Sequence, residues 1–364
     1  SSADGKKLAA GIGGVNGNPP PGPIYVSTDS GLTWVPTSSP VTNWSSVACS
    51  WDGTTLLAVG VDFPALPLYI STNSGSTWET IMVPSSFPGC ESSVACSADA
   101  SVVLVGSSCI AGEAYGSTLF VSTNAGTTWT SNRVSGWPML VSCSAGGQTM
   151  VAASDAAVGN WLLLSRNSGT SWEVGPHGFW NSIACSGDAT TMLGTSGHGG
   201  NGPILFSTDG GHNWTNVSDA GVNGRAVAVS ADGIKMALVG QFTPIFTSHD
   251  SGITWAQDNA PATNWSAVAC SADGSKLVAA VNAGGIYTWQ NTPSPNLNSG
   301  MSDEWLLLSW TVPSIPFRLE QSPNPFSGNW TPVAVTPTLN YTNLRYEVRL
   351  SRPGGTMFYR LASW

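Results

Sequence analysis

Tryptophan recurs along this chain at a position where an exposed ring could stack on a sugar. Trp44, Trp180 and Trp265 each lie five residues before a cysteine, at the start of an apolar segment, and Trp137 is displaced by one residue. Indole faces gathered at one mouth could hold a neutral glycan, whereas the same rings could instead wedge between sheets as packing. The candidate ligand residues are Trp44, Trp137, Trp180, Trp265, Asn43, Asn264 and Arg225.

Seven cysteines raise two other kinds of chemistry. Five occupy one equivalent position of a repeat: Cys49, Cys96, Cys143, Cys185 and Cys270. Equivalent positions in a ring of sheets point the same way, so we expect buried thiols there rather than disulfides, with a metal-binding thiol ring as the alternative. Cys90 and Cys109 stand outside this pattern, at one end of a single repeat. We predict a Cys90–Cys109 disulfide, which would indicate an oxidising compartment.

An octet that begins with serine and ends with tryptophan sets the frame for these side chains. Its six copies start 44, 51, 43, 42 and 41 residues apart, which is about the length of one four-stranded propeller blade. The copies are STDSGLTW (27–34), STNSGSTW (71–78), STNAGTTW (122–129), SRNSGTSW (165–172), STDGGHNW (207–214) and SHDSGITW (248–255). The third position is Asp29, Asn73, Asn124, Asn167, Asp209 or Asp250, and the fifth is always glycine. Asx side chains bond to nearby backbone and glycine accepts positive φ, so each octet predicts a tight turn between strands.

A second phrase lies between the octets. WSAVACSADGSKLVAAV (265–281) is one copy, and it predicts two apolar strands joined by an Asp-Gly turn. Counting these units predicts an all-β, seven-bladed propeller over residues 1–290. The chain opens partway through a blade, and the segment 284–291 lacks an octet, so the first and last blades are incomplete. Such open blade edges could accept a strand from another copy of the chain.

The octets match the pattern S-x-D-x-G-x-T-W, and about residues 3–290 resemble the Asp-box (BNR-repeat) β-propellers. That group includes sialidases, xyloglucanase-type glycoside hydrolases, sortilin-like receptors and photosystem II assembly factors. The resemblance implies that the octets are structural turns on the rim away from the ligand face, so no catalytic role passes to them.

Within that group, a sialidase needs three convergent arginines, and only Arg225 of the propeller's three precedes an inner strand. We therefore reject that activity. A xyloglucanase-like hydrolase needs two facing carboxylates. The loop acids available are Asp62, Glu91, Glu113, Asp155, Asp219 and Asp258.

The rest of the chain is a separate unit. Residues 291–302 (NTPSPNLNSGMS) predict a linker. Five strand-like segments follow, so we expect a small β-sandwich-like module over residues 303–364. Its closing FYRLA (358–362) resembles the C-terminal modules of secreted proteins from Verrucomicrobia-like bacteria.

Charge and hydropathy exclude some classes of partner. The net charge is −9, only 9% of residues are charged, and no basic cluster occurs, which argues against nucleic acid and anionic membranes. The sequence contains no run of 18 apolar residues, so it predicts no transmembrane helix, and no signal peptide is visible.

Together these patterns predict a secreted or cell-surface recognition propeller that is not an enzyme. It would bind a neutral glycan or an extracellular protein at its axial loop face, without a cofactor or metal. The alternatives are a structural subunit of an extracellular assembly and a glycoside hydrolase.

Overall fold

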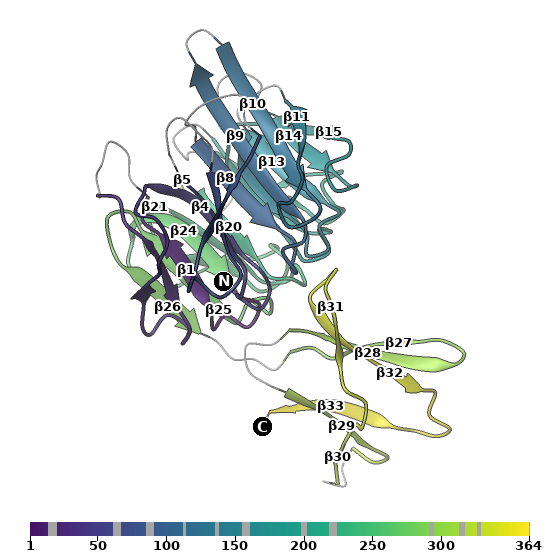
Figure 1. Cartoon of the computed structure of the whole chain (residues 1–364). Helices are drawn as coiled ribbons and strands as arrows, with labels where there is room; N and C mark the ends of the chain where they lie inside the picture. The colour runs from purple at the N-terminus through teal and green to yellow at the C-terminus, as the bar shows by residue number, and fades with distance from the viewer. Residues whose placement is uncertain are drawn as a thin grey trace.

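A computed structural model describes twelve stretches of the chain (Figure 1). They are residues 1–13, 20–60, 67–84, 91–111, 114–134, 138–154, 161–197, 202–217, 224–290, 295–312, 317–325 and 329–363. Across them the structure is all-β, with no helix, and its strands form small antiparallel sheets. None of the described segments could therefore cross a membrane as a helix. The arrangement of these sheets is that of a β-propeller.

The strands follow the order predicted from the repeat, from an inner to an outer position. The first sheet is β1 (Leu8–Gly11), β2 (Ile24–Ser27) and β3 (Val35–Pro36). Next come β4 (Trp44–Cys49), β5 (Leu56–Gly60), β6 (Pro67–Ser71) and β7 (Glu79–Met82), then β8 (Glu91–Cys96), β9 (Val103–Ala111), β10 (Ala114–Ser122) and β11 (Thr130–Arg133). They are followed by β12 (Pro138–Cys143), β13 (Met150–Ser154), β14 (Trp161–Ser165) and β15 (Glu173–His177), then β16 (Trp180–Cys185), β17 (Met192–Ser196), β18 (Ile204–Ser207) and β19 (Thr215–Asn216). Last are β20 (Gly224–Val229), β21 (Met236–Thr243), β22 (Phe246–Ser248) and β23 (Ala256–Gln257), and β24 (Thr263–Cys270), β25 (Lys276–Val281) and β26 (Ile286–Gln290), joined by a short β21–β24 pairing.

Two of these sets have three described strands instead of four. β1 pairs with β2 in the register that β5 keeps with β6, Leu8 opposite Ser27 and Leu56 opposite Ser71, so β1 is a second strand. β24, β25 and β26 are an inner, a second and a third strand, and no described strand pairs with the outer edge of β26. The first sheet thus lacks a described inner strand, and the last lacks a described outer strand.

Each octet is closed by its own side chains. In the first one, Ser27 Oγ donates to Asp29 Oδ1 (2.8 Å), and the amides of Gly31 and Thr33 donate to Ser27 Oγ and Asp29 Oδ1. The same three bonds recur in the other five octets. Gly31 has a φ of 88°, which explains the invariant glycine, since a side chain there would be strained. These turns connect the third and fourth strands.

The turns between inner and second strands form a closed ring around the axis. Each carries a Ser-x-Asp-Gly-like sequence, and the residue after the serine donates its backbone N–H to the equivalent carbonyl of the next turn, at 2.6–2.9 Å. The ring runs through Ala3, Trp51, Ala98, Ala145, Gly187, Ala231 and Ala272, and Ala272 N closes it on Ala3 O at 2.7 Å. The first and last repeats are therefore neighbours in space.

The second strands form the core because neighbouring sheets cover both of their faces. All five residues of β5 and of β17 are buried. At the ends of five inner strands lie free thiols, Cys49, Cys96, Cys143, Cys185 and Cys270. Burial raises the pKa of Cys185 to about 11 and that of Cys270 to about 12, so both thiols stay protonated at neutral pH. Cys90 lies outside the described residues, so the predicted Cys90–Cys109 disulfide stays a prediction.

The C-terminal residues form two further sheets, which lie below the propeller in the view of Figure 1. One is β27 (Asn298–Met301), β28 (Trp305–Thr311), β32 (Arg345–Ser351) and β31 (Thr338–Asn340); the other is β30 (Thr331–Pro332), β29 (Phe317–Ser322) and β33 (Phe358–Ser363). Leu306, Leu308, Trp310, Leu319 and Val348 form the core between them. β27 pairs with β28, so part of the segment expected to be a linker belongs to a sheet instead.

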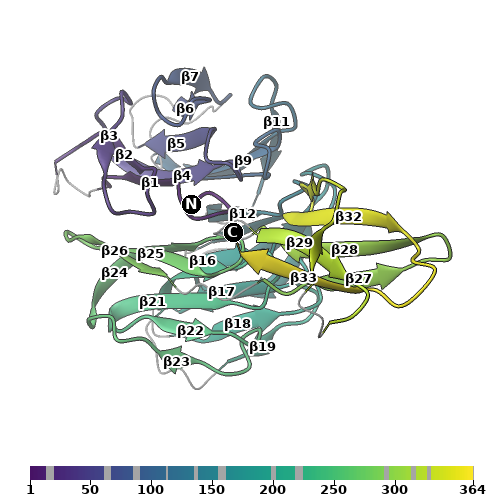
Figure 2. The same cartoon turned by 90° about the horizontal axis from the view of Figure 1, so that it is seen from below.

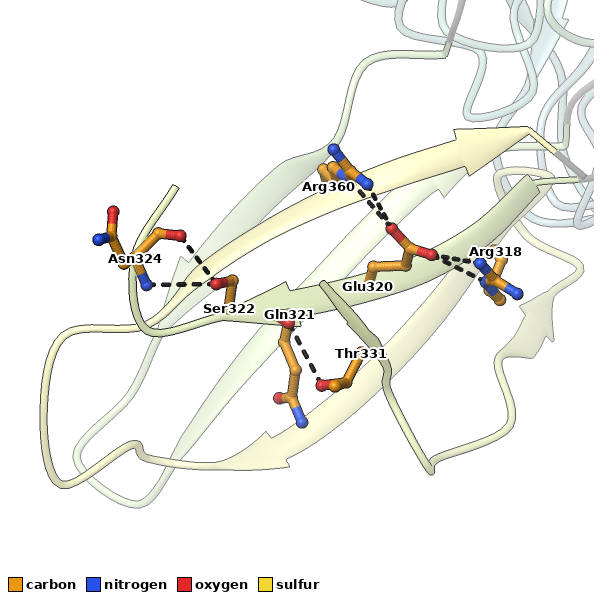
Figure 3. Close-up of polar contacts among 7 residues, drawn as sticks. All are labelled: Arg318, Glu320, Gln321, Ser322, Asn324, Thr331 and Arg360. Carbon is orange, nitrogen blue, oxygen red and sulfur yellow. Dashed lines mark hydrogen bonds and ion pairs between the residues drawn. The ribbon is translucent and has the colours of Figure 1, made fainter. Parts of the chain in front are cut away.

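A buried carboxylate organises the smaller of these two sheets (Figure 3). Glu320 is 3% exposed and accepts hydrogen bonds from Arg318 on its own strand and from Arg360 on β33, the latter at 2.8 Å. The hydrogen bonds from the two guanidinium groups lower the pKa of Glu320, and the bond from Arg318 has the larger effect. Arg360 also lies 4.4 Å from the ring centre of Trp330. This pairing offsets the cost of burying the charge, so loss of an arginine would leave the Glu320 carboxylate buried without that compensation.

Candidate functional site

The recurrent tryptophans are packed between sheets rather than exposed at a mouth. Trp44 is 4% exposed, and Trp180 and Trp265 are 0% exposed. Trp44 and Trp265 donate their Nε1–H groups to backbone carbonyls of the preceding repeat, Gly22 O and Thr243 O, each at 2.9 Å. In this structure the faces of these rings are not available to a sugar, which corrects the expectation of an aromatic platform.

A bulge explains why these rings turn inward. The pairing register shifts immediately after each one, between Trp44 and Ser46, Trp180 and Ser182, and Trp265 and Ala267. A bulge redirects a side chain out of the alternation of its strand. Small residues make room for the redirected rings: a Cβ on Gly194 would lie 2.5 Å from Trp180. Gly194, and Gly11 whose Cβ would lie 2.6 Å from Trp44, were the sequence signal for packing.

The other candidate ligand residues differ in their surroundings. Asn43 and Asn264 are half-buried, and within the described residues each has a buried Oδ1 without a hydrogen-bond partner. Arg225 is exposed at the start of β20. Trp137 lies outside the described residues, as do four of the six loop acids, Asp62, Glu113, Asp155 and Asp219. Asp258 accepts a hydrogen bond from the amide of its neighbour Asn259.

No metal centre emerges from the five thiols. Within the described part of the chain, no group of three or more His, Cys, Asp or Glu side chains could hold a metal ion. Cys185 Sγ instead lies 3.3 Å from Ser142 Oγ on the neighbouring inner strand. The thiols are half-buried, and four of them, Cys96, Cys143, Cys185 and Cys270, pack against apolar clusters as small residues.

The ring of turns is covered by the C-terminal sheets. The turn between β31 and β32 approaches it, and the ring of Tyr341 meets that of Trp51 edge to face at 5.9 Å. A Cβ on Gly187 would lie only 3.0 Å from Asn343 O. Val312, Leu339 and Leu344 belong to one apolar cluster with Ala3, Ala231 and Ala272. This end of the axis is therefore closed by the chain itself (Figures 1 and 2).

An open groove lies where the last repeat meets the first. We call it the seam groove; it has a volume of about 250 Å³ and is lined by β26 residues Thr288, Trp289 and Gln290 and by the first octet. Lys276 bridges its floor, since Nζ donates to Ser30 Oγ at 2.9 Å. Leu32 of the octet is 83% exposed, and Ile286 and Tyr287 of β26 are 38% and 46% exposed. The groove thus brings the exposed Leu32 beside the edge of β26, with which no described strand pairs, and the exposed Ile286 and Tyr287 lie further along the same strand.

Fourth strands occupy the equivalent place in three other repeats. Ser38, just beyond β3, donates from Oγ to Ser76 O of the next octet at 2.8 Å. A Cβ on Gly126 would lie 2.9 Å from Ile81 of β7. Asn132 of β11 donates from Nδ2 to Gly169 O at 3.3 Å. Only the first octet faces a repeat whose fourth strand is not among the described residues. The incomplete last blade was the sequence signal for this groove.

Comparison with known proteins identifies the fold. No protein-family model matches the sequence, and no curated protein matches it either. Solved structures do: YCF48 bound to D1 peptide is 17% identical, with 75% of this chain and 87% of that one covered at a TM-score of 0.53. Kuenenia stuttgartiensis hydrazine synthase is 16% identical (74% and 92% covered, TM-score 0.56). The Myceliophteria thermophila Cps50 (Swd1) β-propeller domain is 11% identical (80% and 95% covered, TM-score 0.56). At these identities the likeness extends to the propeller fold alone.

Proposed function

We propose that this chain is a non-catalytic recognition propeller that binds a protein partner in the seam groove. The observation that carries the proposal is that the edge of β26, with which no described strand pairs, borders a groove beside exposed apolar side chains. An exposed strand edge is a template for another polypeptide, and natural propellers usually cover it. The lining of the groove does not favour a small polar substrate in the same way, because among the described residues that line it only Asp29 and Lys276 have charged side chains.

We infer the architecture behind this function to be a seven-bladed Asp-box propeller over residues 1–290, followed by a β-sandwich-like module over residues 303–364. The closed ring of turns supports the number of blades. The recurring octet bonds support the Asp-box assignment.

The fold neighbours are compatible with a protein partner. One of them is a propeller solved with a peptide bound, which is a fact about that protein. The glycan hypothesis loses support, because its aromatic platform is buried in this structure. A secreted location stays part of the proposal, and it depends on the Cys90–Cys109 disulfide.

Site-specific photocrosslinking tests the proposal. We would place a benzophenone amino acid at Ile286, 38% exposed on β26 two residues before the groove-lining Thr288, and as a matched control at Val174, 63% exposed on β15. The expected result is one protein joined to the Ile286 variant and absent from the control, identified by its crosslinked peptide and then shown to bind in purified form. A glycan array and a solution mass on the same protein address the alternatives. Saturable glycan binding or a stable homo-oligomer, without a crosslinked partner, would refute the proposal.

A further inference from the structure

We propose that the partner enters the seam groove as the fourth strand of the last blade, antiparallel to β26. Its central residues would then lie opposite Thr288, Tyr287 and Ile286. This inference rests on the proposed function, because it assumes that a protein occupies the groove, and it adds the mode and register of binding.

Comparison with a complete blade gives the register. Val103 of β9 lies opposite Cys96 of β8 and opposite Ser122 of β10. In the same way, Leu277 of β25 lies opposite Cys270 of β24 and opposite Trp289 of β26. Thr288, Tyr287 and Ile286 therefore correspond to Val121, Phe120 and Leu119 of β10. In the complete blade these three residues face Thr130, Ser131 and Asn132 of the fourth strand β11.

An independent contact supports the same register. A Cβ on Gly169, in the octet next to β10, would lie 2.6 Å from Val121. A Cβ on Gly31, in the octet next to β26, would lie 2.4 Å from Thr288. The strand and the following octet thus have the same relation at both places.

Exposure shows what the missing strand leaves uncovered. Leu119 and Phe120 are 0% and 2% exposed beneath β11, whereas their equivalents Ile286 and Tyr287 are 38% and 46% exposed. A bound strand would remove this apolar surface from water and would pair the edge of β26 that no described strand covers.

The complete blade also indicates the chemistry of the partner segment. Asn132 donates to Gly169 O, and Val134 belongs to the apolar cluster that includes Trp172 of the next octet. The fitting segment is therefore extended and uncharged at its centre. It carries an amide side chain within reach of Gly31 O and, two residues later, an apolar side chain over Leu32 and Trp34.

The chain's own fourth strand provides a defined probe. A labelled peptide TTWTSNRVS (residues 127–135) is expected to bind the intact protein, measured by fluorescence anisotropy, and to slow amide exchange over Ile286–Gln290. Successive residues of a strand point their N–H groups to opposite sides. Of the N–H groups of Ser131 and Asn132, only one can therefore point toward β26. N-methylation of that residue should weaken peptide binding at least tenfold, and N-methylation of the other should leave the affinity nearly unchanged.

Paired protein variants locate the site. Leu32→Asp should weaken peptide binding at least tenfold, while Ile253→Asp should not. Ile253 holds the same octet position and is 80% exposed, but it does not line the groove.

The outcomes separate this inference from the proposed function. Equal effects of the two N-methyl groups, or amides of Ile286–Gln290 that exchange slowly without peptide, would overturn strand addition. If the peptide fails to bind but the partner still crosslinks at Ile286, recognition stands and this mode of binding is wrong. If neither binds, both proposals fall.

Discussion

Replacing Trp265 with alanine tests whether the recurrent indoles are packing residues. Trp265 is 0% exposed, donates to Thr243 O at 2.9 Å, and meets the ring of Tyr287 edge to face at 5.2 Å. Truncating such a buried aromatic residue costs about 3–5 kcal/mol. In a domain of this size each kcal/mol lowers Tm by about 2–4 °C, so we expect a fall of about 10 °C.

Differential scanning calorimetry provides the measurement, and two further variants make it specific. Trp44→Ala should lose a similar amount, because Trp44 is equally buried but lies away from the seam groove. Trp161→Ala is the control: this ring is 38% exposed, and its main contact is edge to face with His177 at 4.9 Å, worth about 0.5–1.5 kcal/mol. A Trp265→Ala protein that melts within about 2 °C of the parent would refute the packing argument and reopen the question of a glycan platform.

Three other expectations follow from the same structure. Cys185 and Cys270 should resist a thiol reagent at pH 8 in the native protein and react after denaturation, because burial raises both pKa values; rapid native labelling would contradict this. The hydrogen bonds of Thr33 and Thr254 lower the pKa values of Asp29 and Asp250 from 3.8 to about 2, so these carboxylates stabilise the fold above about pH 4 and lose that effect as pH falls through 2. The double variant Asp29→Asn, Asp250→Asn, which copies the Asn73 octet, should therefore show a smaller drop in urea midpoint between pH 6 and pH 3 than the parent. Leu344→Asp should detach the C-terminal sheets from the ring of turns and enlarge the radius of gyration in X-ray scattering, whereas Val335→Asp, at a 44% exposed position, should not.

Local sequence predicted the strands and turns because their interactions are local. Ser27, Asp29 and Gly31 bond within one octet, so the turn can be inferred from eight letters. The orientation of Trp180 could not be inferred in that way. It depends on a bulge after the residue and on space left by Gly194, fourteen residues after Trp180.

Contacts between distant segments were harder still to predict. The turn after β31 packs on the ring of turns, where Tyr341 contacts Trp51. No spacing in the sequence relates these two positions. The one visible sign was that Trp51 stands where the other turns carry alanine or glycine. The absence of an octet after residues 284–291 predicted an incomplete blade, and so a groove at this place. The apolar surface beside the groove became evident only from the exposure of Tyr287 in the structure.

The blade boundary that contains the seam groove is also the one that closes the propeller. Ala272 N–Ala3 O at 2.7 Å and Lys276 Nζ–Ser30 Oγ at 2.9 Å hold it, together with Val312 from the C-terminal sheets. A strand bound in the groove would add hydrogen bonds to β26 and contacts to the first octet, and so would join both sides of this boundary. Because such a ligand binds the closed ring and not the unfolded chain, it would stabilise the ring by about 2.7 kcal/mol at a concentration of 100 Kd. Recognition and ring closure are thereby coupled, and a peptide that occupies the groove should raise the Tm of the propeller.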